Sequence, residues 1–170
     1  MARRARGRDG LGRDLLKGAI AGAVATYVMG KVTGYMYEHE DTEARWAEDE
    51  ARGGSTAYEV AAEKAARAAG TMLEPRQRQE LGSAIHWALG IGAGAAYAVF
   101  RRRVQVLGGT AGTAFGTAFW AFLDEGLVPA LGLTPGPTAF PWQAHARGLV
   151  GHLTFGTVTD GTLRLLDRFA

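Results

Sequence analysis

The chain has 170 residues, the length of one ordinary domain, and its formal net charge is only +2, so its overall charge indicates no particular class of partner. It contains no cysteine, which excludes disulfides, thiolate nucleophiles and cysteine-ligated metal or iron–sulfur sites. Glycine accounts for 25 residues, and such a high content is typical of membrane helices, in which glycine lets two backbones approach closely. The mean hydropathy is near zero because charged and apolar residues occupy separate stretches.

The N-terminal part combines a basic arm, residues 1–14, with the apolar stretch 15–37 that follows it directly. A helix of about 20 residues crosses the hydrocarbon core of a bilayer, so this stretch predicts a first transmembrane helix. The stretch is too long for the apolar region of a signal peptide. We interpret the arm as a cytoplasmic anchor rather than as a tail that binds nucleic acid.

Residues 38–80 are polar, with 11 acidic and 6 basic side chains, and their composition favours helix. Ser55 or Thr56 can cap a helix, and Glu59 is correctly spaced for a capping box. We expect an external helical segment lying near the membrane surface, with Tyr58 among its interfacial anchors.

Three further apolar stretches each predict a transmembrane helix. The second helix covers residues 81–100, the third 104–133 and the fourth 143–166. The third stretch contains a glycine and a proline at 126–129, so two alternatives remain open: one helix covers the whole stretch, or the helix breaks there.

The basic residues at the ends of these stretches indicate an orientation. The N-terminal arm, the arginine triplet at 101–103 and the C-terminal end are basic, whereas the 38–80 segment is acidic. Cytoplasmic ends of membrane helices carry the excess of lysine and arginine. The sequence therefore predicts an all-α integral membrane bundle of four transmembrane helices in a single domain. Both termini lie in the cytoplasm, and an external helical insertion separates helices 1 and 2.

Glycines four residues apart recur in the predicted helices, a spacing typical of close helix packing within a bundle. Self-association into a homo-oligomer through one of these faces is the alternative. The glycines are Gly18, Gly22, Gly30, Gly34, Gly90, Gly94, Gly108, Gly112 and Gly116.

Ionisable side chains within membrane helices are costly and usually mark function. Counting from each helix centre at 1.5 Å per residue places such groups from all four helices in the outer half of the bundle. His145 and Arg147 lie at the rim above them, and Asp160 lies alone on the inner side. The members of the predicted cluster are Lys31, His86, Asp124, Glu125 and His152.

Three explanations of this cluster remain open. In the first, the groups only orient the bundle, with Lys31 paired to Asp124 or Glu125. In the second, they form an outward-opening pocket that responds to acid or passes protons or small ions, since histidine titrates near neutral pH. In the third, His86 and His152 ligate a haem, or bind a metal together with Glu125.

Two parts of the sequence carry a family resemblance. The first is Gly132-Leu133-Thr134-Pro135, followed by Pro141-Trp142 and by Gly151-His152-Leu153; the second comprises the helices 18–34 and 83–99. Together they resemble the YagU-like family of small bacterial inner-membrane proteins of unknown molecular function. The resemblance excludes the 38–80 segment. It implies a multi-pass protein of the bacterial inner (plasma) membrane and a link to survival in acid, and it supplies no catalytic residues.

The sequence thus predicts a polytopic inner-membrane protein of unassigned activity that supports envelope or acid tolerance through an outward-facing ionisable cluster. The alternatives are a protein that conducts protons or small ions and a histidine-ligated haem or metal protein. No nucleophile motif accompanies the cluster, so we do not expect an enzyme, a catalytic residue, a cofactor or a resident metal. The expected partner is the lipid bilayer, without nucleic acid or a small-molecule ligand.

Overall fold

The computed structural model describes residues 2–169, with the side chains of all of these except residues 2–9, 105 and 107. The arginines at positions 3–8 of the predicted basic arm lie outside the described side chains. Every regular element of the described chain is a helix, which confirms the predicted all-α class.

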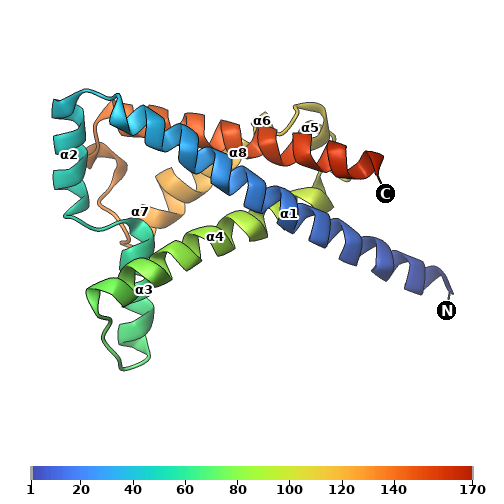
Figure 1. Ribbon diagram of the computed structural model, residues 1–170, viewed down its shortest axis with the longest axis horizontal. Coiled ribbons are helices and arrows are strands. Elements are labelled where there is room, and N and C mark those ends of the chain that lie inside the picture. The colour runs from blue at the N-terminus through green and yellow to red at the C-terminus, as the bar shows by residue number, and fades with distance from the viewer. Residues whose placement is uncertain (1, 170) are drawn as a thin grey trace.

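Three long helices cross to form the body of the molecule (Figure 1). They are α1 (Ala2–Glu38), α4 (Pro75–Phe100) and α8 (Trp142–Arg168). α1 packs against both α4 and α8, while the shorter α6 (Thr113–Phe122) packs against α8. α4 begins at residue 75, before the predicted residue 81. Its first residue is a proline, which suits the first turn of a helix, and residues 74 and 77 form a capping box around that turn.

Glycine lets α1 lie directly against α4. A Cβ atom on Gly22 would come 2.5 Å from the carbonyl oxygen of Gly90, and one on Gly94 would come 2.5 Å from the Cα of Gly22. Gly116 of α6 lies equally close to the backbone of His152 in α8. All of these contacts join helices of the same chain. Glycine is needed at these positions because any larger residue would force the two backbones apart.

Three of the predicted packing glycines lie outside these helix contacts. Gly30 and Gly34 have open space where a Cβ would lie, and a Cβ on Gly108 would meet only the carbonyl of Arg101 in the neighbouring connection. The residues that contact Gly151 of α8 are Met29 and Thr33. Gly30 directly follows Met29, and Gly34 directly follows Thr33. Because an α-helix turns by about 100° per residue, both glycines point away from α8.

The third apolar stretch breaks at a point that neither alternative predicted. α5 (Gln105–Gly109) ends in a turn in which Ala111 and Gly112 have φ values of 49° and 84°. Positive φ is incompatible with a right-handed helix, so this turn separates α5 from α6.

Of the two alternatives for residues 126–129, the structure shows the continuous helix. From α6 the chain continues through a π-helical turn, η1 (Leu123–Leu127), into α7 (Val128–Ala130). Pro129 lies in the first turn of α7, where the missing N–H of proline is best tolerated. The wider π turn accommodates the proline without ending the helix.

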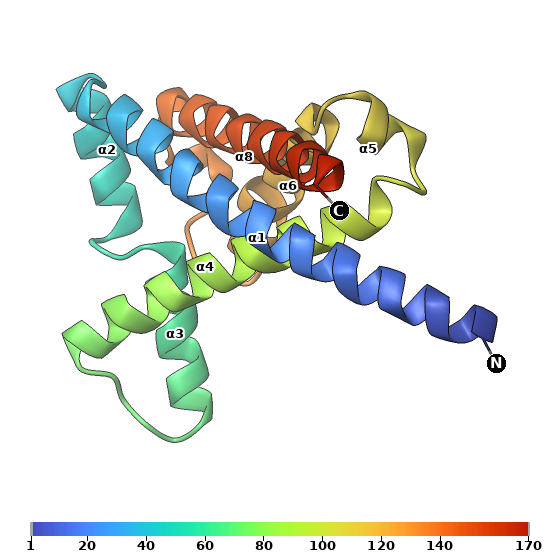
Figure 2. The same cartoon turned by 45° about the vertical axis from the view of Figure 1, so that its right-hand side comes forward.

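The segment between α1 and α4 forms two short helices, α2 (Thr42–Arg52) and α3 (Ala57–Ala68). The predicted capping box is confirmed, with Thr56 as the N-cap and Glu59 as its partner. Both helices lie at the end of the molecule opposite the two termini and α5 (Figures 1 and 2). The connection from α7 to α8, which contains the short helix η2 (Pro137–Ala139), lies at the same end as α2.

Two helical segments, Gly10–Glu38 and Pro75–Phe100, are long and apolar enough to cross a membrane. In their most apolar windows only 28% and 22% of the residues are buried, whereas a core helix of a soluble protein is mostly buried. Large apolar side chains therefore cover the outside of the body. Examples are Leu16, Ile20, Tyr27, Leu89, Phe100 and Phe122.

Candidate functional site

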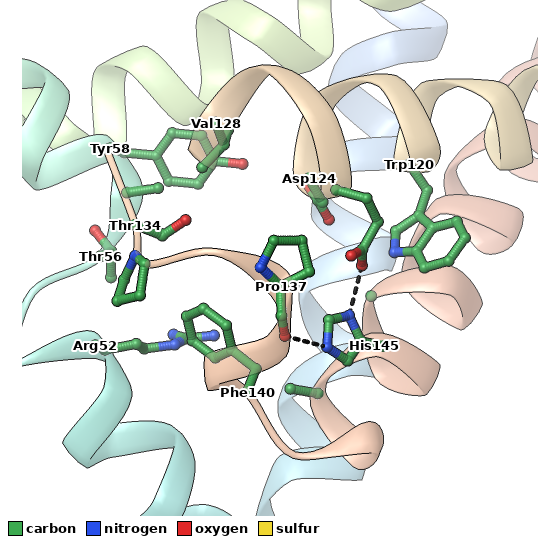
Figure 3. Close-up of a pocket in the computed structure, with 15 residues that line it drawn as sticks. Arg52, Thr56, Tyr58, Trp120, Asp124, Val128, Thr134, Pro137, Phe140 and His145 are labelled. Atoms are coloured by element: carbon green, nitrogen blue, oxygen red, sulfur yellow. Dashed lines mark hydrogen bonds and ion pairs between the residues drawn. The ribbon is translucent and has the colours of Figure 1, made fainter. Parts of the chain in front are cut away.

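A pocket of about 240 Å³ opens at the end of the molecule that carries α2 and α3. Its walls come from α2, α3, the α6–α7 segment, the connection around η2 and α8, and Figure 3 shows their side chains converging on one space. The residues that determine its chemistry are Arg52, Tyr58, Trp120, Asp124, Glu125 and His145.

Two of the predicted ionisable residues, Asp124 and Glu125, line this pocket from the π-helical turn η1. On a regular α-helix, consecutive side chains point about 100° apart, and the local widening of a π turn redirects them. Turns of this kind are frequent at functional sites.

His145 forms the most informative contacts in the pocket. Its Nδ1 lies 2.6 Å from Oε1 of Glu125, and its Nε2 lies 3.0 Å from the carbonyl oxygen of Pro137, as the dashed lines in Figure 3 mark. A carbonyl oxygen only accepts hydrogen bonds, so Nε2 donates its proton to Pro137. The contact between Nδ1 and Glu125 then requires a second proton, carried by the imidazole or by the carboxyl group.

Deeper in the bundle, His152 is only 3% exposed and lies near Asp124. Its Nδ1 donates to the carbonyl of Gly148 at 3.0 Å and lies 3.5 Å from Oδ2 of Asp124. His152 also lines a second cavity of about 20 Å³, together with His86 and Tyr58. That volume holds about one water molecule, so it is too small for the haem that the two histidines were considered to bind.

Tyr58 connects the two cavities because it lines both of them. The predicted interfacial anchor in fact points inward, with its ring centre 4.9 Å from that of His86. Burial, assisted by the carboxylate of Asp124, raises the pKa of Tyr58 to about 12. Its hydroxyl therefore keeps its proton and remains a hydrogen-bond donor at any physiological pH.

Aromatic rings close the inner side of the second cavity. The Phe119 ring lies 5.3 Å from His152, and the Phe115 ring lies 5.7 Å from Phe119 and 4.9 Å from Tyr97. The hydroxyl of Tyr97 in turn donates to Asp160 at 2.9 Å. Apolar rings therefore separate the outer ionisable groups from Asp160.

Lys31 is the one predicted cluster member that the structure sets apart. It is exposed, and its ammonium lies 5.5 Å from the ring centre of Tyr27 on the same helix. Within residues 2–169 no ion pair links Lys31 to Asp124 or Glu125, so the expected pairing is wrong. Lys31 follows Met29 by two residues, and about 200° of rotation turns it away from α8.

Arg147, expected at the rim, is instead buried within a group of charges. It pairs with Glu40 and Glu48, and its guanidinium lies 5.0 Å from the ring centre of Tyr37. Glu48 is fully buried and pairs also with Arg52 of the pocket wall. The sequence does not single out Glu40 and Glu48, because their spacing does not distinguish them from the other acids of the 38–80 segment.

The motif that carried the family resemblance builds one wall of the pocket. Residues Gly132–Pro135 follow α7, and the last two of them line the pocket. The carbonyl oxygen of Gly132 accepts a hydrogen bond of 3.0 Å from Lys64, which ties the motif to α3. Pro141 then precedes Trp142, the first residue of α8.

No set of three metal-ligating side chains gathers in the described part of the chain.

A family model described as "Protein of unknown function (DUF1440)" matches residues 60–161, more than half of the chain. The chain belongs to the DUF1440 family. The DUF1440 match covers α4 and most of the pocket but excludes α1 and α2. No curated protein and no solved structure shows significant similarity to the chain.

Membership of DUF1440 confirms the predicted resemblance as far as a family of unknown function. The name YagU-like rests on the sequence motifs alone. The family description contains no activity.

Proposed function

We propose that this DUF1440 protein crosses the bacterial inner membrane four times, with both termini in the cytoplasm, as the YagU-like resemblance implies. Its outward-facing pocket takes up protons when the surroundings become acidic and thereby supports envelope or acid tolerance. The proposal rests above all on His145, which needs a shared proton to contact the Glu125 carboxylate and the Pro137 carbonyl at once.

The surface of the helices supports the membrane location. Two segments have the length and composition of transmembrane helices, and most of their residues are exposed. Exposed apolar side chains on long helices are costly in water and favourable in lipid.

The charge distribution supports the orientation. The acidic helix α2 lies at one end of the molecule, while both termini and the arginine triplet 101–103 lie toward the other (Figure 1). Basic ends are retained in the cytoplasm, which leaves the pocket facing outward.

The groups around the pocket suit a response to acid. An imidazole–carboxylate pair changes its charge and its hydrogen bonding between about pH 7 and pH 4. The Glu125–His145 pair joins η1 to α8 and the His145–Pro137 contact joins α8 to the pocket wall. A change in their protonation therefore alters contacts between three separate segments.

Conduction of protons or small ions is the alternative that the aromatic rings disfavour. A conducting path needs successive polar groups or water across the bundle. Phe115 and Phe119 instead lie between His152 and the inner Tyr97–Asp160 pair.

The test uses Trp120, which lines the pocket, as a fluorescent reporter. A variant in which phenylalanine replaces the other three tryptophans is placed in nanodiscs and titrated from about pH 8 to about pH 4. We expect a sigmoidal change in emission that Glu125→Gln abolishes or displaces. Glu80→Gln, which changes a carboxylate with 62% side-chain exposure, serves as the control and should leave the curve unchanged.

Proton flux in proteoliposomes separates the alternatives. A wild-type protein whose emission titrates without flux supports an acid-responsive pocket, whereas flux that is lost in Glu125→Gln supports conduction. Emission that stays constant across the titration would contradict the proposal and leave the pairs as contacts that orient the bundle.

A further inference from the structure

A second polar site lies at the opposite end of the molecule, where the C-terminal parts of α4 and α8 approach α5 (Figure 2). A shallow pocket of about 360 Å³ opens there. Three of its six lining residues are arginines. The lining residues are Arg101, Arg102, Gly108, Asp160, Arg164 and Asp167.

The two carboxylates in this pocket already have partners. Asp160 accepts from the Nε of Arg164 at 2.5 Å and lies 3.5 Å from Nη1 of Arg101. Asp167 accepts from Lys17 at 2.8 Å and from Nη2 of Arg101 at 2.5 Å. These pairs hold α1, α4 and α8 together and keep the arginine side chains in place.

The cations outnumber the carboxylates. Arg102 adds a longer pair of 3.5 Å with Asp14, which leaves four cations and three carboxylates around the pocket. The four cations are Lys17, Arg101, Arg102 and Arg164, and the carboxylates are Asp14, Asp160 and Asp167. One positive charge is therefore in excess, which matches the single negative charge of a phosphodiester.

Hydrogen-bond donors remain available in the pocket. The side chains of Arg102 and Arg164 are 53% and 56% exposed, and Nη1 of Arg164 has no partner among the described residues. The buried Nε of Arg101 also lacks a hydrogen-bond partner in the described chain. The planar fork of a guanidinium group binds two oxygens of a phosphate at once.

We propose that this arginine pocket binds a phosphate group, carried by an anionic phospholipid or present as a free anion. Exposed Phe100 and Val106 lie on the elements that flank the opening. Apolar flanks suit the acyl chains of a lipid. The phosphate chemistry is independent of the acid-responsive pocket, while the lipid source depends on the proposed cytoplasmic position of this end.

The experiment compares lipid retention by the full-length protein in nanodiscs of phosphatidylglycerol and of phosphatidylcholine, followed by native mass spectrometry. We expect selective retention of phosphatidylglycerol. Removing one cation should weaken that retention about fivefold, so Arg102→Gln and Arg164→Gln are the test variants. Arg76→Gln, at an arginine with 89% side-chain exposure near the other end of α4, is the matched control and should retain lipid like the wild type.

Inorganic phosphate is titrated against the bound lipid to identify the source. Displacement by millimolar phosphate would support a site for the free anion, and retention despite phosphate would support a headgroup site. Equal retention of both lipids without any binding of phosphate would overturn the proposal. So would unchanged retention in both variants, provided that thermal unfolding shows them to be folded.

Discussion

At the scale of single residues, Arg147 and Asp167 illustrate how strongly the fold changes the role of a charge. Arg147 is 6% exposed and neutralises the fully buried Glu48, so it links α8 to α2. Asp167 pairs with both Lys17 and Arg101, so it links α8 to α1 and α4. Each ion pair joins residues that are far apart in the sequence. The sequence around each residue does not show which partner it will meet.

Arg147→Met should lower the free energy of unfolding by about 3–5 kcal/mol, because Glu40 and the buried Glu48 would lose their shared cation. Glu48 would keep only Arg52 as a partner. Denaturant unfolding in detergent measures the loss. Arg67→Met, at a site with 74% side-chain exposure, is the control and should change stability by less than about 1 kcal/mol. Similar effects of the two substitutions would show that the buried pair contributes no more than a surface pair.

Asp167 predicts a dependence of stability on pH. Burial raises the pKa of its carboxyl group, but the hydrogen bond from Lys17 and the charge of Arg101 outweigh burial, and the pKa lies below its usual range. Its contribution is therefore present above the unfolded pKa of about 3.9 and is lost as the pH falls through the lower folded pKa.

The Asp167→Asn variant should consequently unfold at a lower temperature than the wild type at about pH 7, and the two should converge below about pH 3. Thermal unfolding measured over that range checks the expectation. A difference that is constant with pH would mean that the carboxylate charge contributes nothing.

At the scale of the elements, glycine contacts and a π turn determine how the helices meet. α1 and α4 cross where Gly22 lies against Gly90 and Gly94. The glycine spacing predicted close packing, but two of the nine glycines, Gly30 and Gly34, face open space. Which small residues meet a partner depends on the rotation of each helix, which the spacing alone does not determine.

Gly94→Ala should destabilise the protein by about 1–3 kcal/mol, because the added Cβ would overlap the α1 backbone. The matched control lies on the same helix, where a Cβ on Gly92 would have no neighbouring atom within 4 Å. Gly92→Ala should be neutral or stabilising by up to about 1 kcal/mol, since alanine favours helix more than glycine does. Chemical denaturation of both variants measures the difference, and equal effects would contradict the proposed contact.

At the scale of the whole molecule, the two proposed sites lie near opposite ends. Asp124, Glu125 and His145 lie near the acidic end, whereas the arginine pocket lies near the basic end. The proposed orientation assigns these sites to opposite sides of the membrane, so it can be tested without reference to any activity.

Single cysteines provide that test, because the natural chain contains none. Met72 and Phe169 are 88% and 82% exposed and lie at the two ends of the molecule. A membrane-impermeant thiol reagent applied to intact cells should label Met72→Cys at once and Phe169→Cys only after permeabilisation. The reverse pattern would overturn the orientation, and immediate labelling of both would contradict the three membrane crossings proposed between these two positions.

The amino-acid sequence by itself determined the helical class, the polar segment after the first long helix and the capping box of α3. These features follow from local composition and short-range hydrogen bonds, such as the one between Thr56 and Glu59. It also pointed to Asp124, Glu125 and His152, since ionisable residues are conspicuous in apolar stretches.

Only the tertiary structure decided which of these groups meet. Lys31 and Glu125 are both ionisable residues of apolar stretches, yet Lys31 faces outward while Glu125 binds His145. The same holds for Glu48 and Arg101, whose partners come from helices distant in the sequence. Sequence spacing specifies the depth of a side chain along its own helix. Whether two side chains meet also depends on how each helix is rotated and on how the two helices cross. Rotation and crossing are determined by the packing of the whole chain.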